Sequence, residues 1–249
     1  VEGVFNAEEY LNTLSRAVTH SIPKPIALVI SFPSNPTAQL CDLDFYKELV
    51  KFAKKHSIWI LSDLAYSEIY FDDNPPPSIL QIEGAKEVCV EFTSMSKTFS
   101  MAGWRVGFAV GNKYLINALT RIKSYLDYGA FTPVQVAAVE ALNGPQVYID
   151  QIRNEYKRRR DTLIASMNRA GWEIPKPPAT MFAWAPIPRK FQNMGSMEFA
   201  KMLMQKASVA VAPGIGFGEY GEGYVRIGLV ENEHRIRQAA KSIKKLIIG

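Results

Sequence analysis

A lysine and an arginine share the segment Ser-Met-Ser-Lys-Thr-Phe-Ser-Met-Ala-Gly-Trp-Arg, residues 94–105. The amine of Lys97 can form a Schiff base with a carbonyl, which divides one difficult reaction into two easier steps. The guanidinium of Arg105 offers a planar set of donors that suits a phosphate. Small neighbours, among them Ser94, Ser96 and Gly103, allow other groups to approach closely. This spacing indicates a covalent cofactor that bears both a carbonyl and a phosphate.

The apolar runs around this segment predict the strands that position it. Residues 26–32 and 58–61 are rich in β-branched and aromatic side chains, and between them Asp42 or Asp44 begins a helical pattern. Strand, helix and strand in this order predict a parallel crossover. Further strands are predicted at 88–93 and 106–110. Because the connection between these two is too short for a crossover helix, the fourth strand should run antiparallel.

Polar residues follow the predicted strands at one edge of the sheet. Ligands of open α/β sheets lie beyond the carboxyl ends of parallel strands. Asn35, Asp63, Ser94 and Lys97 each lie within a few residues of such an end, and Arg105 opens the returning antiparallel strand. We therefore expect these five residues to converge on one crevice.

The rest of the chain predicts a connector and a smaller domain. Thr132 and Pro133 provide a cap and first turn for a helix that runs to about residue 143, and a second helix covers about 145–170. Strands are expected at 182–185, 209–212 and 224–229, before a closing helix that contains Ile236 and Ile247. We therefore predict an α/β fold with a mostly parallel sheet in residues 1–144 and a smaller α+β domain in 145–249.

Composition excludes several classes of function. The 249 residues are 47% hydrophobic, and their net charge of +5 is spread along the chain, so neither nucleic acid nor a membrane is expected as a partner. There is no apolar run of membrane-spanning length. The two cysteines, Cys41 and Cys89, suggest reduced thiols and a cytoplasmic setting. The three histidines are far apart in sequence and form no metal motif.

The expected crevice holds the groups that pyridoxal phosphate requires. Asp63 would keep the pyridine nitrogen protonated, since a nearby carboxylate favours the charged form. Tyr66 could share the phenolic oxygen of the cofactor with Asn35. Ser94 and Arg105 would bind the phosphate, with Ser96 as a weaker candidate. In the smaller domain, Arg226 could bind a substrate carboxylate through two hydrogen bonds.

These residues lie in segments that resemble the signature blocks of class I/II aminotransferases, a family that uses pyridoxal phosphate. The blocks are Ser-Phe-Pro-Ser-Asn-Pro-Thr at 31–37, Asp-Leu-Ala-Tyr at 63–66, the Ser-Met-Ser-Lys and Met-Ala-Gly-Trp-Arg-Val-Gly motifs within 94–107, and Tyr-Val-Arg-Ile at 224–227. The resemblance implies that Lys97 forms the Schiff base and that Asp63 pairs with the pyridinium. It also implies that Asn35 and Tyr66 contact the phenolic oxygen of the cofactor. Ser94 and Arg105 are implied to bind the cofactor phosphate, and Arg226 the substrate α-carboxylate.

Finer features resemble bacterial alanine (glutamate-pyruvate) transaminases and diaminopimelate aminotransferases. Among them are Phe-Thr-Pro-Val-Gln-Val-Ala-Ala at 131–138 and Pro-Gly-Ile-Gly-Phe-Gly at 213–218. The resemblance implies L-amino acid and 2-oxo acid substrates and a homodimer. Ala38 departs from the family pattern, which has glycine there. Complete members also have a long N-terminal portion before these blocks, so we expect the sequence to be part of a longer enzyme and to bind cofactor poorly alone.

Several alternatives remain open on the sequence alone. The same residues would serve a β-lyase, since cofactor and fold do not fix the reaction. They would also serve a cofactor-sensing domain of a transcription regulator, or the chain could be an inactive fragment. Residues 216–221 match the Gly-x-Gly-x-x-Gly pattern of dinucleotide sites, but a strand rather than a helix is predicted after them, so a loop is favoured.

Overall fold

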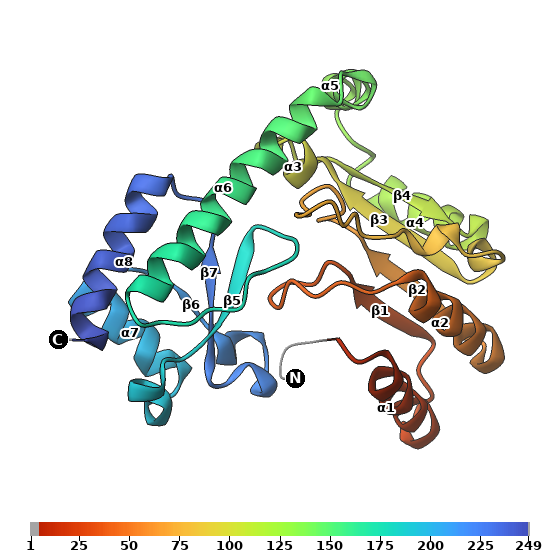
Figure 1. The fold of residues 1–249 in the computed structure, drawn as a ribbon. Coiled ribbons are helices and arrows are strands. Elements are labelled where there is room, and N and C mark those ends of the chain that lie inside the picture. Colours follow the sequence, from red (N-terminus) through yellow and green to blue (C-terminus); the bar gives the residue numbers. More distant parts are fainter. Residues whose placement is uncertain (1–4, 249) are drawn as a thin grey trace. The chain divides into compact units, whose positions relative to one another are not determined.

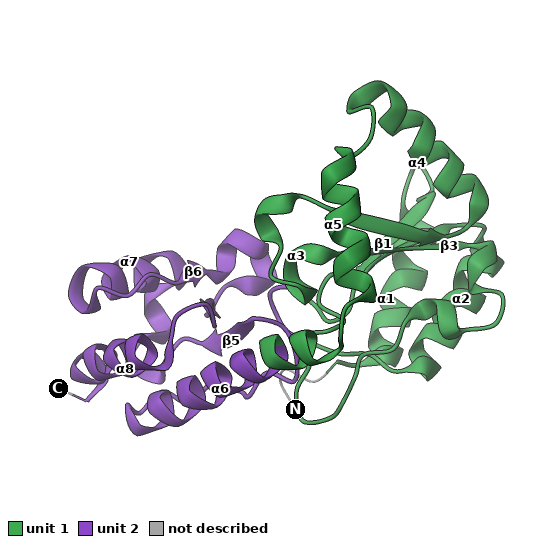
Figure 2. Cartoon of the chain, turned by 90° about the horizontal axis from the view of Figure 1, so that it is seen from above, with its two compact units in different colours: residues 1–34, 39–152 green, residues 35–38, 153–249 purple. Residues whose placement is uncertain are grey.

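The computed structural model describes residues 5–248, which form two compact units. Of these described residues, the first unit contains 5–34 and 39–152, and the second contains 35–38 and 153–248 (Figure 2). The division runs through α6 (Val147–Arg169), the helix that is expected to connect the two domains. No helix in the described part of the chain is long and apolar enough to cross a membrane.

A four-stranded sheet forms the centre of the first unit (Figure 1). Its order is β1 (Ala27–Ser31), β2 (Trp59–Asp63), β3 (Cys89–Ser94) and β4 (Gly107–Gly111). The first three strands are parallel, and β4 runs antiparallel to β3 with Ser94 opposite Gly107. Both the parallel crossover and the antiparallel fourth strand are thus confirmed.

Among the residues that the structure describes, a buried core covers only one face of this sheet. The helix α2 (Leu43–His56) begins at Asp42, one of its two predicted caps, whose side chain accepts a hydrogen bond from the Phe45 amide at 2.8 Å. Leu49 of α2 packs in one buried cluster with Ile30 and Ile60 of the sheet, and α1 (Ala7–His20) adds side chains to that cluster. Strand side chains alternate between faces. Val29, on the opposite face, is accordingly 69% exposed.

The remaining elements of the first unit are mostly short. The 3-10 turns η1 (Ile79–Gln81) and η2 (Ala85–Glu87) precede β3, and α3 (Met95–Thr98) and η3 (Ala102–Trp104) connect β3 to β4. They are followed by α4 (Lys113–Leu126) and α5 (Thr132–Asn143). The structure confirms the helix predicted for α5, but the predicted cap is wrong by one residue: Phe131 is the cap and Thr132 is the first helical residue.

A three-stranded antiparallel sheet forms the second unit, in the order β5 (Phe182–Pro186), β7 (Tyr224–Gly228) and β6 (Ala212–Pro213). Besides α6, the unit contains η4 (Arg189–Met194), α7 (Ser196–Ala207), η5 (Gly214–Phe217), η6 (Glu219–Gly221) and α8 (Glu233–Ile247). Its own core includes Trp172, Phe199 and Ile243. Each unit therefore has a separate hydrophobic core.

The predicted strand at 209–212 is wrong in its extent. Only Ala212 and Pro213 pair with β7. Proline has no N–H to extend the ladder. The chain then turns at once into η5, because the backbone of Gly214 lies against that of Gly221.

Candidate functional site

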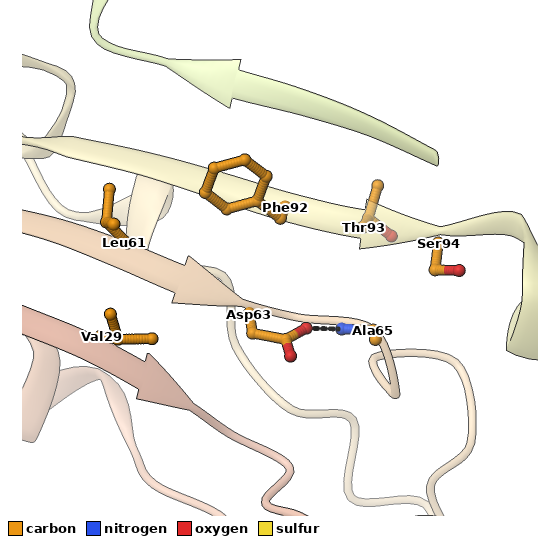
Figure 3. Close-up of a pocket in the computed structure, with 7 residues that line it drawn as sticks. All are labelled: Val29, Leu61, Asp63, Ala65, Phe92, Thr93 and Ser94. Carbon is orange, nitrogen blue, oxygen red and sulfur yellow. Dashed lines mark hydrogen bonds between the residues drawn. The ribbon is translucent and has the colours of Figure 1, made fainter. Parts of the chain in front are cut away.

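The open face of the first unit's sheet contains a pocket of about 380 Å³ (Figure 3). Its lining comes from the ends of β1, β2 and β3 and from the turn after β2: Val29, Leu61, Asp63, Ala65, Phe92, Thr93 and Ser94. Apolar side chains thus line the middle of the strands, while a carboxylate and two hydroxyl groups lie at their carboxyl ends. The pocket therefore combines an apolar surface for a flat ring with polar groups at one edge.

Asp63 is held in place by the turn that follows β2. Its Oδ1 accepts a hydrogen bond from the Ala65 amide at 3.1 Å, and the Leu64 amide donates to the Phe92 carbonyl of the neighbouring strand at 2.8 Å. The side chain of Asp63 is exposed to the pocket. Its carboxylate can therefore meet a cationic group that enters there.

Lys97 lies in the short helix α3, which begins directly after β3. Ser94 caps this helix, since its Oγ accepts a hydrogen bond from the Ser96 amide at 3.2 Å. The Nζ of Lys97 lies 6.0 Å from the centroid of the Tyr66 ring, close enough for a cation–π interaction. Tyr66 is only 8% exposed, so its ring offers a fixed surface beside the amine.

Arg105 lies on the same connection between β3 and β4. It is exposed and has a left-handed backbone conformation, with φ of 52°. Its Nη1 donates to the Ala102 carbonyl at 3.0 Å. Nearby, the Met95 amide donates to the Val106 carbonyl at 3.2 Å and closes the connection. Ser94, Ser96, Lys97 and Arg105 therefore lie on one compact connection at the end of β3.

Arg226 lies in the second unit, at the centre of β7. Its Nη1 donates to Asn35 Oδ1 at 2.7 Å, and Asn35 belongs to the same unit. The Cζ of Arg226 lies 4.2 Å from the ring centroid of Phe182 and 4.6 Å from that of Phe217. The guanidinium is thus positioned by an amide oxygen and two aromatic rings.

Sequence reasoning missed the pairing of Asn35 with Arg226 and both aromatic rings. The predicted role of Asn35 beside Tyr66 remains a prediction. Alternation along the strands offered a signal: Phe182 and Trp184 share one face of β5, and Trp184 lies opposite Arg226 in the register. Phe217 comes from a loop, and nothing in the sequence pattern would have placed it there.

The described residues do not have the arrangement of a metal site or of a dinucleotide site. Within residues 5–248, no group of three or more histidine, cysteine or acidic side chains could hold a metal ion. The Gly-x-Gly-x-x-Gly pattern at 216–221 is followed by β7, which confirms the prediction of a strand after it. A dinucleotide site needs a helix at that position.

Comparison with known proteins identifies the family to which this chain is similar. The family model for aminotransferase class I and II matches residues 4–243. A putative aminotransferase AatC from Rhizobium meliloti is 67% identical over 240 residues, which cover 96% of this chain and 59% of that protein. The glutamate-pyruvate aminotransferase AlaC of Escherichia coli is 51% identical over 246 residues, or 99% of this chain and 59% of that protein. The chain thus spans 59% of the length of these relatives.

A more distant relative also matches this chain in sequence, and two solved structures match it in fold. An LL-diaminopimelate aminotransferase from Moorella thermoacetica is 43% identical over 91% of this chain and 59% of its own length. The BacF structure from Bacillus subtilis matches with a TM-score of 0.86 and 38% identity over 90% of this chain and 56% of that one. An aromatic aminotransferase from Pyrococcus horikoshii matches with a TM-score of 0.88 and 28% identity over 96% of this chain and 63% of that one. The chain belongs to the class I and II aminotransferases, a family of pyridoxal-phosphate-dependent enzymes.

Proposed function

We propose that this chain carries the cofactor-binding and catalytic residues of an aminotransferase. The enzyme would move an amino group between an L-amino acid, alanine or glutamate, and a 2-oxo acid. The main support is the position of Lys97 beside Tyr66, in the short helix α3 that directly follows β3. The end of β3 lines the pocket together with Asp63 of β2. The choice of alanine and glutamate is supported by the 51% identity to a glutamate-pyruvate aminotransferase.

The donor set of the first unit fits pyridoxal phosphate. The Lys97 amine can react with its carbonyl, and the Asp63 carboxylate can pair with its ring nitrogen. The hydroxyl groups of Ser94 and Ser96 and the guanidinium of Arg105 can donate to its phosphate. The apolar side chains of the pocket match the faces of the ring. Asn35 and Tyr66 are proposed to donate to the phenolic oxygen.

When bound, pyridoxal phosphate withdraws electrons from the substrate α-carbon. The Lys97 amine would act as general base and take a proton from that carbon, and would then act as general acid and deliver the proton to the carbonyl carbon of the cofactor. Asp63 would keep a proton on the ring nitrogen, since a nearby carboxylate favours the charged form of that nitrogen. Tyr66 keeps the amine of Lys97 against its ring face and so limits its positions.

Arg226 is proposed to bind the substrate α-carboxylate. An arginine fork can donate two parallel hydrogen bonds to a carboxylate, which fixes its orientation as well as its position. One Nη already donates to Asn35, and two aromatic rings have their centroids within 4.6 Å of the guanidinium carbon. These contacts already restrict the Arg226 side chain, so it loses less conformational entropy when a substrate binds.

We also propose that the active protein is a homodimer. The support comes from α4, α5 and the connection between them, where large apolar side chains are exposed to solvent. They include Tyr125, Leu126, Tyr128, Phe131 and Val136. Monomeric soluble proteins rarely expose large apolar patches, and such patches often mark interaction surfaces.

Replacement of Lys97 tests the proposed function. We expect Lys97→Ala to lower the rate of alanine formation from pyruvate and glutamate by about 100-fold or more, the usual contribution of a general base. Bound cofactor should also lose the absorbance that its covalent bond to the lysine produces. The exposed Lys86 provides the control, and Lys86→Ala should leave both measurements unchanged. Full activity of Lys97→Ala would refute the assignment.

A second candidate function is the amination of a diaminopimelate precursor. It is supported by the 43% identity to an LL-diaminopimelate aminotransferase. Rates with alanine and with LL-diaminopimelate as amino donors, each with 2-oxoglutarate, separate the two. Release of pyruvate from cystathionine would instead indicate a β-lyase.

A further inference from the structure

The loop of residues 214–223 joins β6 to β7 and carries one of the two rings that flank Arg226. Phe217 lies near the middle of this loop, 4.6 Å from the guanidinium carbon, although its side chain is 39% exposed. Its ring also meets that of Trp184 edge to face at 5.8 Å. An exposed ring on a loop stays packed against another side chain only if other contacts fix the backbone of the loop.

The two ends of this loop are in backbone contact. A Cβ added to Gly214 would lie 1.9 Å from the Gly221 carbonyl oxygen, and one added to Gly221 would lie 2.1 Å from that of Gly214. Real atoms do not approach so closely, so both positions require glycine. Residues 215–220 therefore form a closed loop with a narrow base.

One buried serine and one carboxylate fasten that base. Ser196 Oγ donates to Glu222 Oε2 at 3.0 Å and accepts from the Ile215 amide at 3.1 Å. Glu222 Oε1 accepts from the amides of Ser196 at 2.5 Å and Gly223 at 3.1 Å. Ser196 is fully buried, so these bonds face no competition from water at its hydroxyl. The pair, which we call the Ser196–Glu222 clasp, thus contacts both ends of the loop.

The clasp also lies at the start of α7. The cap residue of this helix, Gly195, has no side chain to accept from the first amides. Glu222 accepts instead, and a negative charge at a helix N-terminus is favourable. The same carboxylate therefore caps α7 and holds the loop, and a role in helix capping alone is the simpler alternative.

We propose that Ser196 and Glu222 are positioning residues for the substrate carboxylate: they hold the 214–223 loop so that Phe217 packs against Arg226. This inference rests on the proposed function, because it assumes that Arg226 binds the carboxylate. An ordered loop lowers the entropy lost on binding, and a packed ring keeps the guanidinium fork in one orientation. Neither residue contacts the reacting atoms.

The test measures binding of succinate, a carboxylate that does not react, to the cofactor-loaded protein by calorimetry. Ser196→Ala and Glu222→Gln should each weaken binding by about tenfold, the scale on which lost preorganisation changes affinity. Amide exchange in residues 214–223 should become faster. Glu222→Gln keeps the shape of the side chain, so it provides a variant that folds if Ser196→Ala does not.

A matched control separates positioning from capping. Asn232 caps α8, where its Oδ1 accepts from the Arg235 amide at 3.0 Å, with no bond to the 214–223 loop. Asn232→Ala should lower the melting temperature without changing succinate affinity. If the clasp variants also lower only the melting temperature, the proposal is overturned.

A double-mutant cycle adds a second readout. Phe217→Ala should weaken succinate binding, and Ser196→Ala should add little to it, since both changes remove the same contact. Fully additive losses would contradict the proposal.

Succinate binding also distinguishes failure of the carboxylate role proposed for Arg226 from failure of the role proposed for the Ser196–Glu222 clasp. If Arg226→Lys leaves succinate affinity unchanged, the carboxylate role proposed for Arg226 fails, and the clasp proposal fails with it. If Arg226→Lys weakens binding but the clasp variants do not, only the clasp proposal is overturned.

Discussion

Glu91 is a buried carboxylate on the covered face of the sheet, where it has no role in the proposed chemistry. Its oxygens accept from Ser78 Oγ at 2.7 Å and from the Ile79 amide at 3.1 Å. These bonds fasten η1 to β3 and close the segment that carries Tyr66. Burial raises the pKa of Glu91, and the hydrogen bonds from Ser78 and Ile79 oppose that change only in part.

This environment predicts a pH dependence of stability. Because the folded protein keeps the proton of Glu91 at a higher pH than the unfolded chain does, the free energy of unfolding should fall as pH rises from the ordinary glutamate pKa to the raised one. Glu91→Gln cannot titrate. The stability of the wild type relative to this variant should therefore decline with pH in urea unfolding experiments. Glu83→Gln, at an exposed position, is the control. If the difference in free energy of unfolding between the wild type and Glu91→Gln stayed constant with pH, the prediction would be contradicted.

Asp63→Asn tests the proposed interaction with the ring nitrogen. The amide fills the same space, so cofactor should still bind. Without the negative charge the nitrogen loses its proton, and proton transfer at the substrate α-carbon should slow by at least about 100-fold in single-turnover experiments. Asp44→Asn, in the first turn of α2, should leave the rate unchanged. An unchanged rate in Asp63→Asn would refute its role.

Sequence reasoning reaches individual residues best where a strand end fixes their place. Asp63 and Ser94 were predicted at neighbouring strand ends, and both line the pocket. The bond from Arg226 to Asn35 joins residues 191 positions apart in the chain. No local pattern encodes such a distant pair, because it depends on how the whole second unit packs.

At the scale of elements, the cap of α2 offers a quantitative prediction. Asp42 accepts from the Phe45 amide, and its negative charge also favours the helix N-terminus. Asp42→Ala should lower the free energy of unfolding by about 1 kcal/mol, measured by urea titration. Asp42→Ser should recover most of that loss, since serine also accepts from the amide. A loss of similar size in both variants would show that the cap bond is not the cause.

Among the described residues, three helices of twelve residues or more, α1, α4 and α7, were not predicted from the sequence, nor was the four-residue helix α3. Two had a usable signal, because Asn6 and Asn112 cap α1 and α4 with their side chains. The start of α7 had none, since its cap is glycine and Glu222, which accepts from its first amide, lies 26 positions away in the chain. The strands were easier to predict because parallel strands buried on one face are short, apolar and bounded by proline or polar residues.

At the scale of the whole molecule, α4 differs from the other long helices. Among its described residues none is buried, although it has apolar side chains at helical spacing. Tyr125 and Leu126 are 77% and 76% exposed, and Tyr128 and Phe131 of the following connection are 90% and 74% exposed. A helix of this kind normally packs its apolar stripe against another surface. The proposed homodimer would supply that surface from a second copy.

The dimer proposal predicts that one charge in this region will separate the subunits. Leu126→Asp should shift the protein from dimer to monomer in sedimentation equilibrium, because a carboxylate in an apolar interface is left without solvation or a partner. The helix itself should persist in circular dichroism, since the replaced side chain is exposed within the single chain. Gln205→Asp introduces the same charge on the exposed side of α7 and should remain dimeric. A Leu126→Asp protein that sediments as the wild-type dimer would place the interface elsewhere.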